Sequence, residues 1–192
     1  MLVMALPLPA ATPAAPALDL ALRFEVFDPV TGLAAYLGLR RDQGEPEVRR
    51  RLGRGDRCFV GWLGERIVTA VWVATERAYV PYLRRDLVLR PGDAYEYDLF
   101  TAPELRGRGL VAAHTAVIRA RIAAAGARRC LALVAVENRA SRALLARNGW
   151  RAIGRVGVLR LGALQRLSCQ ALGSEPLPGF AAPSRRAGSR SR

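Results

Sequence analysis

Two short stretches of this sequence combine residue types that can carry chemistry. The first is the run "RGRG", residues 106–109, which directly precedes an Ala-rich stretch with helical spacing. Backbone N–H groups in the first turn of a helix lack partners within the helix, and they lie at the positive end of its dipole. Gly107 and Gly109 lack the Cβ atoms that would keep a phosphate away. We therefore predict that the backbone of residues 107–111, with Arg106 and Arg108 beside it, binds a pyrophosphate group.

The second stretch is the acidic pair Glu96 and Asp98, in "AYEYDLF". Because alternate residues of a strand point to the same face, we expect both carboxylates on one face. A carboxylate positioned beside a reacting ammonium group can take its proton. Both residues are therefore candidate general bases. The alternative is that they form only the polar face of a half-exposed strand.

The elements that must position these residues follow from hydrophobic periodicity and turn residues. Residues 22–28 alternate like a strand, 31–56 have the spacing of two short helices, and 57–75 resemble a hairpin. An irregular connection with a short strand follows. The remaining pattern predicts a strand at 94–100, a helix at 107–125 and an apolar strand at 130–137. A short helix at 139–148 and closing strands at 150–162 follow. This alternation indicates a sheet covered by helices.

The glycine turn does not match two common nucleotide-binding motifs. A Walker A loop would continue with Lys and Ser or Thr, and the dinucleotide fingerprint would need a third glycine where Ala112 stands. A repeated arginine-glycine motif for nucleic acids is also absent, because this run occurs once. The order of the elements around the turn is more informative than the turn itself.

In that order, the chain resembles the GNAT superfamily of acyl-CoA-dependent N-acetyltransferases. The family signature is the motif Arg/Gln-x-x-Gly-x-Gly/Ala at a strand–helix turn. About thirty residues later come Asn-x-x-Ala/Ser and a Gly-aromatic pair. Here the matching positions are Arg106, Gly109, Val111, Asn138, Ser141, Gly149 and Trp150. The resemblance covers roughly residues 22–162 in element order and is specific over 96–152.

The resemblance implies an α/β (α+β) fold with a central mixed, mostly antiparallel sheet. The sheet would have six to seven strands splayed in the middle, with about four flanking helices. It also implies acetyl-CoA as co-substrate and no metal. The cofactor-binding residues would be Phe100, Thr101, Arg106, Gly107, Arg108, Gly109, Leu110, Val111, Asn138 and Ser141. Asn138 can also serve as a helix N-cap alone.

The chemistry implied is attack of a neutral amine on a thioester carbonyl in a ternary complex. Glu96 lies where several family members place a carboxylate base, and backbone N–H groups near Phe100 and Thr101 would polarise the carbonyl. Two positions depart from the family pattern. Val111 replaces a small residue, so we expect weakened but not abolished CoA binding. Leu145 replaces the Tyr that protonates the leaving thiolate, and Ser141 or Tyr97 are possible substitutes.

The acceptor would lie near the first two helices and the loops by the splay. Tyr79 and Tyr82 are candidate acceptor-binding residues, and several arginines lie in the same region: Arg40, Arg41, Arg49, Arg50, Arg51, Arg54, Arg84 and Arg85. These arginines would suit an anionic acceptor or would form an ordinary solvated basic face. The sequence does not distinguish a small metabolite, an amino sugar, a peptide N-terminus or a lysine side chain.

Other reactive residue types have simpler interpretations. His114 lies on the helix stripe that should face the sheet, so we expect it to be packed rather than catalytic. Cys58, Cys130 and Cys169 are widely spaced in apolar surroundings, which is typical of buried thiols and argues against disulfides or a zinc site.

The 192 residues fit one domain with tails: a flexible Pro/Ala leader (1–20), the acetyltransferase domain (21–168) and a disordered tail (169–192). No apolar run is long enough for a membrane span, so we expect a cytoplasmic monomer or homodimer. The net charge of +14 comes from arginine alone, which resembles a compositional bias and disfavours a nucleic-acid partner. The alternatives are a degenerate CoA-binding module and, last, a basic nucleic-acid-binding protein.

Overall fold

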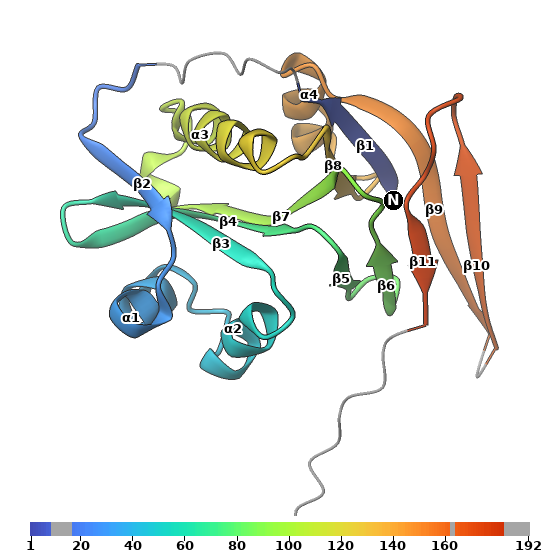
Figure 1. Cartoon of the computed structure of the whole chain (residues 1–192), viewed down its shortest axis with the longest axis horizontal. Coiled ribbons are helices and arrows are strands. Elements are labelled where there is room, and N and C mark those ends of the chain that lie inside the picture. The colour runs from blue at the N-terminus through green and yellow to red at the C-terminus, as the bar shows by residue number, and fades with distance from the viewer. Residues whose placement is uncertain (9–16, 162–163, 183–192) are drawn as a thin grey trace, which may run out of the picture.

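The computed structural model describes residues 1–8, 17–161 and 164–182 of the chain. Its main sheet has eight strands in the order β10-β9-β1-β8-β7-β4-β3-β2 (Figure 1). These are β1 (Leu2–Pro7), β2 (Leu22–Val26), β3 (Arg57–Leu63), β4 (Arg66–Ala74), β7 (Asp93–Thr101), β8 (Arg129–Val134), β9 (Arg151–Leu161) and β10 (Leu164–Ala171). All neighbouring strands are antiparallel except β7 and β8, so the predicted mixed, mostly antiparallel sheet is confirmed.

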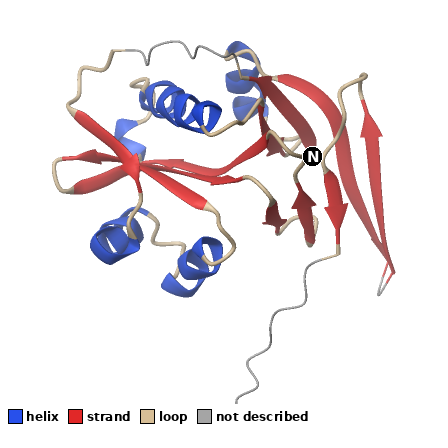
Figure 2. Cartoon of the chain, viewed as in Figure 1, coloured by secondary structure: helices blue, strands red, loops and turns tan. Residues whose placement is uncertain are grey.

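Helices cover both faces of this sheet, as Figures 1 and 2 show. α1 (Pro29–Leu39) and α2 (Glu45–Leu52) lie on one face, and α3 (Leu110–Ala124) and α4 (Arg139–Arg147) lie on the other. A one-turn 3-10 helix, η1 (Pro103–Leu105), precedes α3. Apolar side chains fill both layers: Tyr36 of α1 packs with Trp72 of β4 on one face, and Ile118 of α3 is buried against the other face. None of the helices in the described ranges is long and apolar enough to cross a membrane.

A second, three-stranded sheet was only partly expected. β5 (Arg77–Val80), β6 (Arg85–Val88) and β11 (Gly179–Ala181) pair in the order β11-β6-β5. Their apolar side chains join those of β1, β8 and β9 in one buried cluster. The stretch that we expected to be an irregular connection with one short strand therefore forms a hairpin.

The expectation of a flexible leader is wrong for the first residues of the chain. Leu2 to Pro7 form β1, which lies inside the main sheet and pairs with both β8 and β9. The physical reason is the uninterrupted apolar run, because Val3 and Ala5 pack on one face and Leu2 and Met4 on the other. Residues 9–16, which make up most of the rest of that leader, lie outside the described residues.

The expectation of a disordered tail from residue 169 is also wrong in part. β10 continues to Ala171, and β11 pairs with β6. Leu177 packs into the buried cluster between the sheets, which gives this segment the apolar contacts that its composition did not indicate. The last ten residues, 183–192, lie outside the described part of the chain.

Candidate active site

The parallel strands β7 and β8 separate partway along their length. They pair only from Asp93 to Tyr95 on β7 and from Arg129 to Leu131 on β8. β7 nevertheless continues to Thr101 and β8 to Val134. Beyond the paired segment, the backbone groups of β7 that face β8 are left without ladder partners, and they are available to an extended ligand.

The predicted anion-binding turn lies at the end of β7. Gly107 and Gly109 have φ angles of +76° and +78°, which L side chains rarely adopt. A Cβ at Gly107 would meet no atom within 4 Å, and one at Gly109 would meet only Leu18 Cδ2 at 3.6 Å. Space beside the turn is therefore open. The turn can therefore accommodate a pyrophosphate group, because its backbone is curved by the two positive φ angles and no side chain in the described part of the chain fills the space beside it.

The first turn of α3 supplies the donors. Gly109 is the N-cap and offers no side-chain acceptor, and the first intrahelical bond recorded is from Ala113 N–H to Gly109 C=O. The N–H groups of Leu110, Val111 and Ala112 thus have no acceptor within the helix. Arg108 is exposed beside them. Arg106 instead donates from Nε to the Thr101 carbonyl at 3.3 Å, which ties the turn to the end of β7.

Leu110 and Val111 differ in their surroundings. Leu110 is buried and packs with Leu105 and Val68, so its side chain anchors the first turn of α3 to the sheet. Val111 is only partly buried. Its carbonyl accepts a hydrogen bond from Thr115 Oγ1 at 2.8 Å, while its N–H lies in the first turn.

The Glu96 carboxylate lies beneath α3, one residue beyond the last paired residue of β7. Its oxygens accept hydrogen bonds from Arg119 Nε and Nη2 at 3.1 and 3.3 Å, and only 8% of the residue is exposed. The Arg119 guanidinium lies 5.3 Å from the centre of the Trp150 ring. The Cys130 thiol also contacts Glu96, and burial raises the pKa of that thiol. Arg119 was not recognised as a site residue from the sequence, and Trp150 was named only as the aromatic residue of the family signature.

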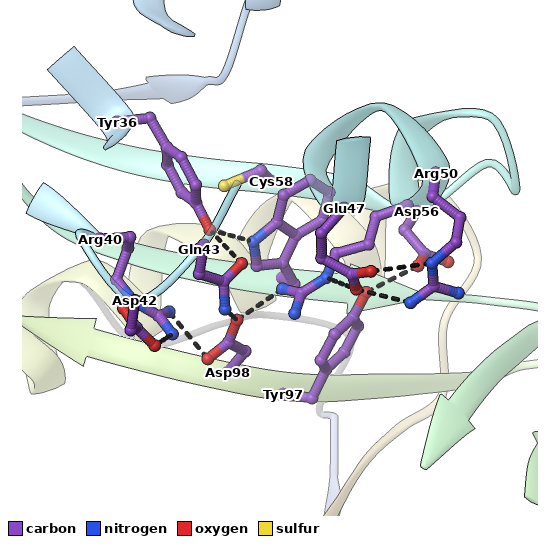
Figure 3. Close-up of polar contacts among 12 residues, drawn as sticks. Tyr36, Arg40, Asp42, Gln43, Glu47, Arg50, Asp56, Cys58, Tyr97 and Asp98 are labelled. Atoms are coloured by element: carbon purple, nitrogen blue, oxygen red, sulfur yellow. Dashed lines mark hydrogen bonds and ion pairs between the residues drawn. The ribbon is translucent and has the colours of Figure 1, made fainter. Parts of the chain in front are cut away.

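Asp98 lies on the opposite face of the sheet, so the expectation that it shares a face with Glu96 is wrong. Between Tyr97 and Phe100, β7 contains one residue more than the facing segment of β4, and Asp98 has a φ angle of +52°. This bulge breaks the two-residue alternation. Asp98 accepts hydrogen bonds from Arg40 at 2.7 Å and from Gln43 at 2.9 Å, and it accepts a third from Arg51 (Figure 3).

Tyr97 lies in the same network as Asp98. Its hydroxyl donates to Asp56 Oδ2 at 2.6 Å, and burial raises its pKa above the ordinary value (Figure 3). The Arg51 guanidinium lies 5.3 Å from the Tyr97 ring and 5.0 Å from the Trp72 ring. A buried hydroxyl bound to a carboxylate is poorly placed to protonate a leaving thiolate.

The arginines of the α1–α2 region are mostly neutralised by acids. Five of the six are ion-paired: Arg40 with Asp42 and Asp98, Arg49 with Glu45, Arg50 with Glu47, Arg51 with Glu47 and Asp98, and Arg54 with Asp56. Only Arg41 has no acidic partner within the described residues. These pairs weaken the argument for an anionic acceptor in this region.

The remaining predicted residues occupy separate places. Asn138 Oδ1 accepts a hydrogen bond from Ser141 N–H at 3.0 Å, so Asn138 is the N-cap of α4. Tyr79 lies in β5, where its ring is 5.9 Å from the Arg50 guanidinium, and Tyr82 is exposed in the β5–β6 turn. Leu145 packs against the core beneath α3.

His114 and the cysteines follow their expected roles with one exception. His114 is buried, stacks on Phe24 at 4.9 Å, and burial lowers its pKa to about 4. It is therefore a neutral core residue. Cys58 and Cys130 are buried, whereas Cys169 is exposed on β10 because that strand lies at the edge of the sheet.

Comparison with known proteins decides the family. A family model described as Acetyltransferase (GNAT) family matches residues 31–150, well over half of the chain. The chain belongs to the GNAT family. The matched range runs from α1 to Trp150 and contains the glycine turn, the separated strands and α4. No curated protein matches this GNAT chain at a significant level.

Solved structures support the same GNAT fold. An aminoglycoside acetyltransferase, AAC(6')-Iy, in complex with a bisubstrate analogue is 17% identical, with a TM-score of 0.57 over 73% of this chain and 97% of that one. AAC(6')-Ih from Acinetobacter baumannii is 14% identical, with a TM-score of 0.56 over 74% and 99%. An acetyltransferase of Trypanosoma brucei is 19% identical, with a TM-score of 0.53 over 73% and 99%. At these identities the likeness concerns the fold alone.

Proposed function

We propose that this GNAT protein transfers an acetyl group from acetyl-CoA to a primary amine by direct attack in a ternary complex. The observation that carries the proposal is the glycine turn, Gly107 to Gly109, at the start of α3. It combines positive φ angles, open space and free N–H groups at the end of the separated strand β7. Family membership and a solved relative described as a complex with CoA support this use of the turn.

In this proposal the backbone from Gly107 to Val111 binds the pyrophosphate, and Arg108 adds charge. The unpaired edge of β7 near Phe100 and Thr101 hydrogen-bonds the pantetheine arm, together with Asn138 and Ser141 at the start of α4. The side chain of Leu110 anchors the turn to the sheet, and only its backbone N–H faces the ligand. Arg106 holds the turn against Thr101, so its role is to maintain the shape of the site.

Glu96 is the base that we propose for the amine. It is the first residue of β7 beyond the paired segment, so its carboxylate lies at the apex of the gap between β7 and β8. The amine would lose a proton to Glu96, directly or through water, and its lone pair would attack the thioester carbonyl. Backbone N–H groups near Phe100 would stabilise the negative charge on the carbonyl oxygen. The C–S bond then breaks, and the sulfur leaves as a thiolate.

Asp98 is the less suitable base because three donors already occupy its carboxylate. We propose that it holds the bulge of β7 in place. Tyr97 is a poor replacement for the missing Tyr at Leu145 because its hydroxyl donates to Asp56, whereas Ser141 stays a candidate. Departure as a thiolate needs neither, because a thiol has an ordinary pKa near 8.5. The acceptor would approach from the α1–α2 face, near Tyr79 and Tyr82, and its amine would reach Glu96 on the other face through the gap between β7 and β8.

Calorimetric titration with acetyl-CoA tests the proposal directly. We expect saturable binding by the unmodified chain and none by Gly109→Glu, which places a carboxylate in the anion site. Gly64→Glu is the matched control, because Gly64 also has a positive φ and open space but lies in the β3–β4 turn. Absence of binding at millimolar acetyl-CoA, or equal loss in both variants, would contradict the assignment.

A CoA-binding module without catalysis is the alternative that Leu145 and the two arginine-paired carboxylates favour. An acetyl-transfer assay over small amines, amino sugars and peptides separates the two functions. Turnover with any of them supports the enzyme. Tight acetyl-CoA binding without turnover supports the module.

A further inference from the structure

The charge of this protein is unevenly divided along the chain. Residues 1–100 contain thirteen arginines and thirteen acidic residues, whereas residues 101–192 contain seventeen arginines and three acidic residues. The whole net charge of +14 therefore belongs to the second half. A compositional preference for arginine over lysine explains why the cations are arginine, but it does not explain why acids are missing from one half only.

The longest stretch without acids coincides with one side of the fold. Between Glu137 and Glu175 there are seven arginines and no acidic residue. This stretch forms α4, β9 and β10, the part of the molecule that contains the outer strands of the main sheet (Figure 1). The ion-paired arginines of α1 and α2 lie on the other side of the molecule, away from β9 and β10 (Figure 1). The two regions therefore differ in net surface charge.

Strand register places several of these arginines on the side of the sheet that carries α4. Arg155 of β9 is directly opposite Leu2, whose side chain packs in the cluster beneath α3. Arg166 of β10 is opposite Leu159, which is four residues from Arg155 and so on the same face of β9. Arg139, Arg142 and Arg147 come from α4 itself. We call these five residues the basic edge: Arg139, Arg142, Arg147, Arg155 and Arg166.

The side chains of the basic edge are largely free. Within the described residues, four of them form no hydrogen bond or ion pair through the guanidinium, and Arg142 donates only to the Val136 carbonyl at 2.9 Å. In contrast, Arg151, which belongs to the opposite face of β9, is paired with Glu175. Free guanidinium groups with no nearby acid bind phosphate groups through paired N–H donors.

The shape of this region suits an extended polyanion. β9 has eleven residues and thus spans roughly 35 Å, about one turn of B-form DNA. The β9–β10 hairpin leaves Arg160, Leu161 and Arg166 exposed toward its end. Beyond Arg155, β9 pairs within the described residues only with β10, and a two-stranded ribbon of this kind fits the major groove of a duplex. We propose that the basic edge binds the phosphate backbone of a double-stranded nucleic acid, independently of the acetyl-CoA site.

Two sequence arguments disfavoured a nucleic-acid partner: the charge resembles a compositional bias toward arginine, and the run at 106–109 occurs only once. The position of the free arginines in the fold changes that expectation. The binding would come from phosphate contacts by a folded ribbon and helix rather than from a repeated motif. Exposed Leu159 and Leu161 near the hairpin end would also suit an anionic lipid surface. The lengthwise spread of the charges favours the duplex, and vesicles are included in the test.

The experiment measures binding of the full chain to a fluorescent 20-base-pair duplex, as DNA and as RNA, between 50 and 300 mM salt, with acetyl-CoA saturating. We expect a dissociation constant below about 100 µM at 50 mM salt and a log–log salt slope of about −4. Arg155→Gln with Arg166→Gln should lower affinity at least about tenfold and reduce the slope by about 2. Arg41→Gln with Arg57→Gln is the matched control, because it removes the same charge from exposed positions of the first half.

Four results would overturn the proposal. These are no duplex binding at 50 mM salt, equal loss in the test and control variants, displacement of the duplex by acetyl-CoA, and binding to vesicles of anionic phospholipid without binding to either duplex. Gly109→Glu should leave duplex binding unchanged. The fate of this proposal is therefore separate from that of the acetyltransferase assignment.

Discussion

Glu96 and Asp98 are two residues apart on β7, yet their carboxylates bind arginines on opposite faces of the sheet. Glu96 is held by Arg119 of α3, and Asp98 is held by Arg40 and Arg51 of the α1–α2 region. One extra residue in β7 produces this separation. The two carboxylates therefore act on different sides of the proposed site, and substitutions can address them independently.

Arg119 should hold the Glu96 carboxylate in position beneath α3. Arg119→Met removes both hydrogen bonds to that carboxylate and leaves a buried anion without its partner. We expect kcat/KM to fall at least about tenfold while the affinity for acetyl-CoA changes little, and Arg119→Lys, which keeps the positive charge, to lose less. Arg121→Met, on the same helix and bound only to the Phe24 carbonyl, should leave kcat/KM unchanged. A loss of acetyl-CoA affinity as large as the loss of kcat/KM would indicate a structural role alone.

Asp98 should contribute to stability through its buried arginine partners. Asp98→Asn keeps the shape and tolerates the positive φ, but it leaves Arg40 and Arg51 without their shared anion. We expect urea unfolding to show a loss of about 3 kcal/mol. Asp42→Asn is a close control, because that largely exposed carboxylate also pairs with Arg40 and should cost less than about 1 kcal/mol. Equal costs would show that burial of the Asp98 pair is unimportant.

Val111 should limit the affinity for acetyl-CoA. Its β-branched side chain is in the first turn of α3, next to the proposed pyrophosphate position. We expect Val111→Ala to tighten binding by about three- to tenfold in a calorimetric titration, since relief of a mild steric contact is worth about 1 kcal/mol. Val117→Ala makes the same change two turns further along α3 and controls for helix propensity. Unchanged affinity in Val111→Ala would mean that its side chain points away from the ligand.

His114 should make folding sensitive to mild acid. Its folded pKa of about 4 is below the ordinary 6.5, so the unfolded chain binds the proton more readily. Stability from this residue is therefore complete above about pH 6.5 and is lost as pH falls toward 4. Between pH 7 and 4.5 the loss should be about 2.5 kcal/mol. His114→Phe, which retains a ring beside Phe24, should show a correspondingly smaller change in urea unfolding over that range; parallel pH curves would refute the assignment.

The sequence predicted correctly those features that depend on residues close together along the chain. The glycine turn, the N-cap at Asn138 and the packing of His114 each depend on neighbours along the chain or on one helical stripe. The splay in the middle of the mixed sheet followed from the family resemblance. These features are the frame of the candidate site, and the structure contains them where the sequence placed them.

The features that escaped prediction depend on partners distant in sequence. β1 pairs with strands more than 120 residues away, and only the apolar run Leu2–Leu6 hinted at burial. The bulge at Asp98 has no local signal, because the extra residue is defined only by the pairing of β7 with β4. Arg119 stands among other arginines, and only the fold shows that it is the one facing Glu96.

The place of β1 has a consequence for biosynthesis. β1 is synthesised before its two neighbours in the sheet, and β8 and β9 follow it by more than 120 residues. Its backbone groups therefore have no partner on one side until β8 has emerged and none on the other until β9 has emerged, and such distant pairings form slowly. During that interval an apolar strand with open edges is exposed, so chaperone contact at β1 would protect this chain while the rest is still being synthesised.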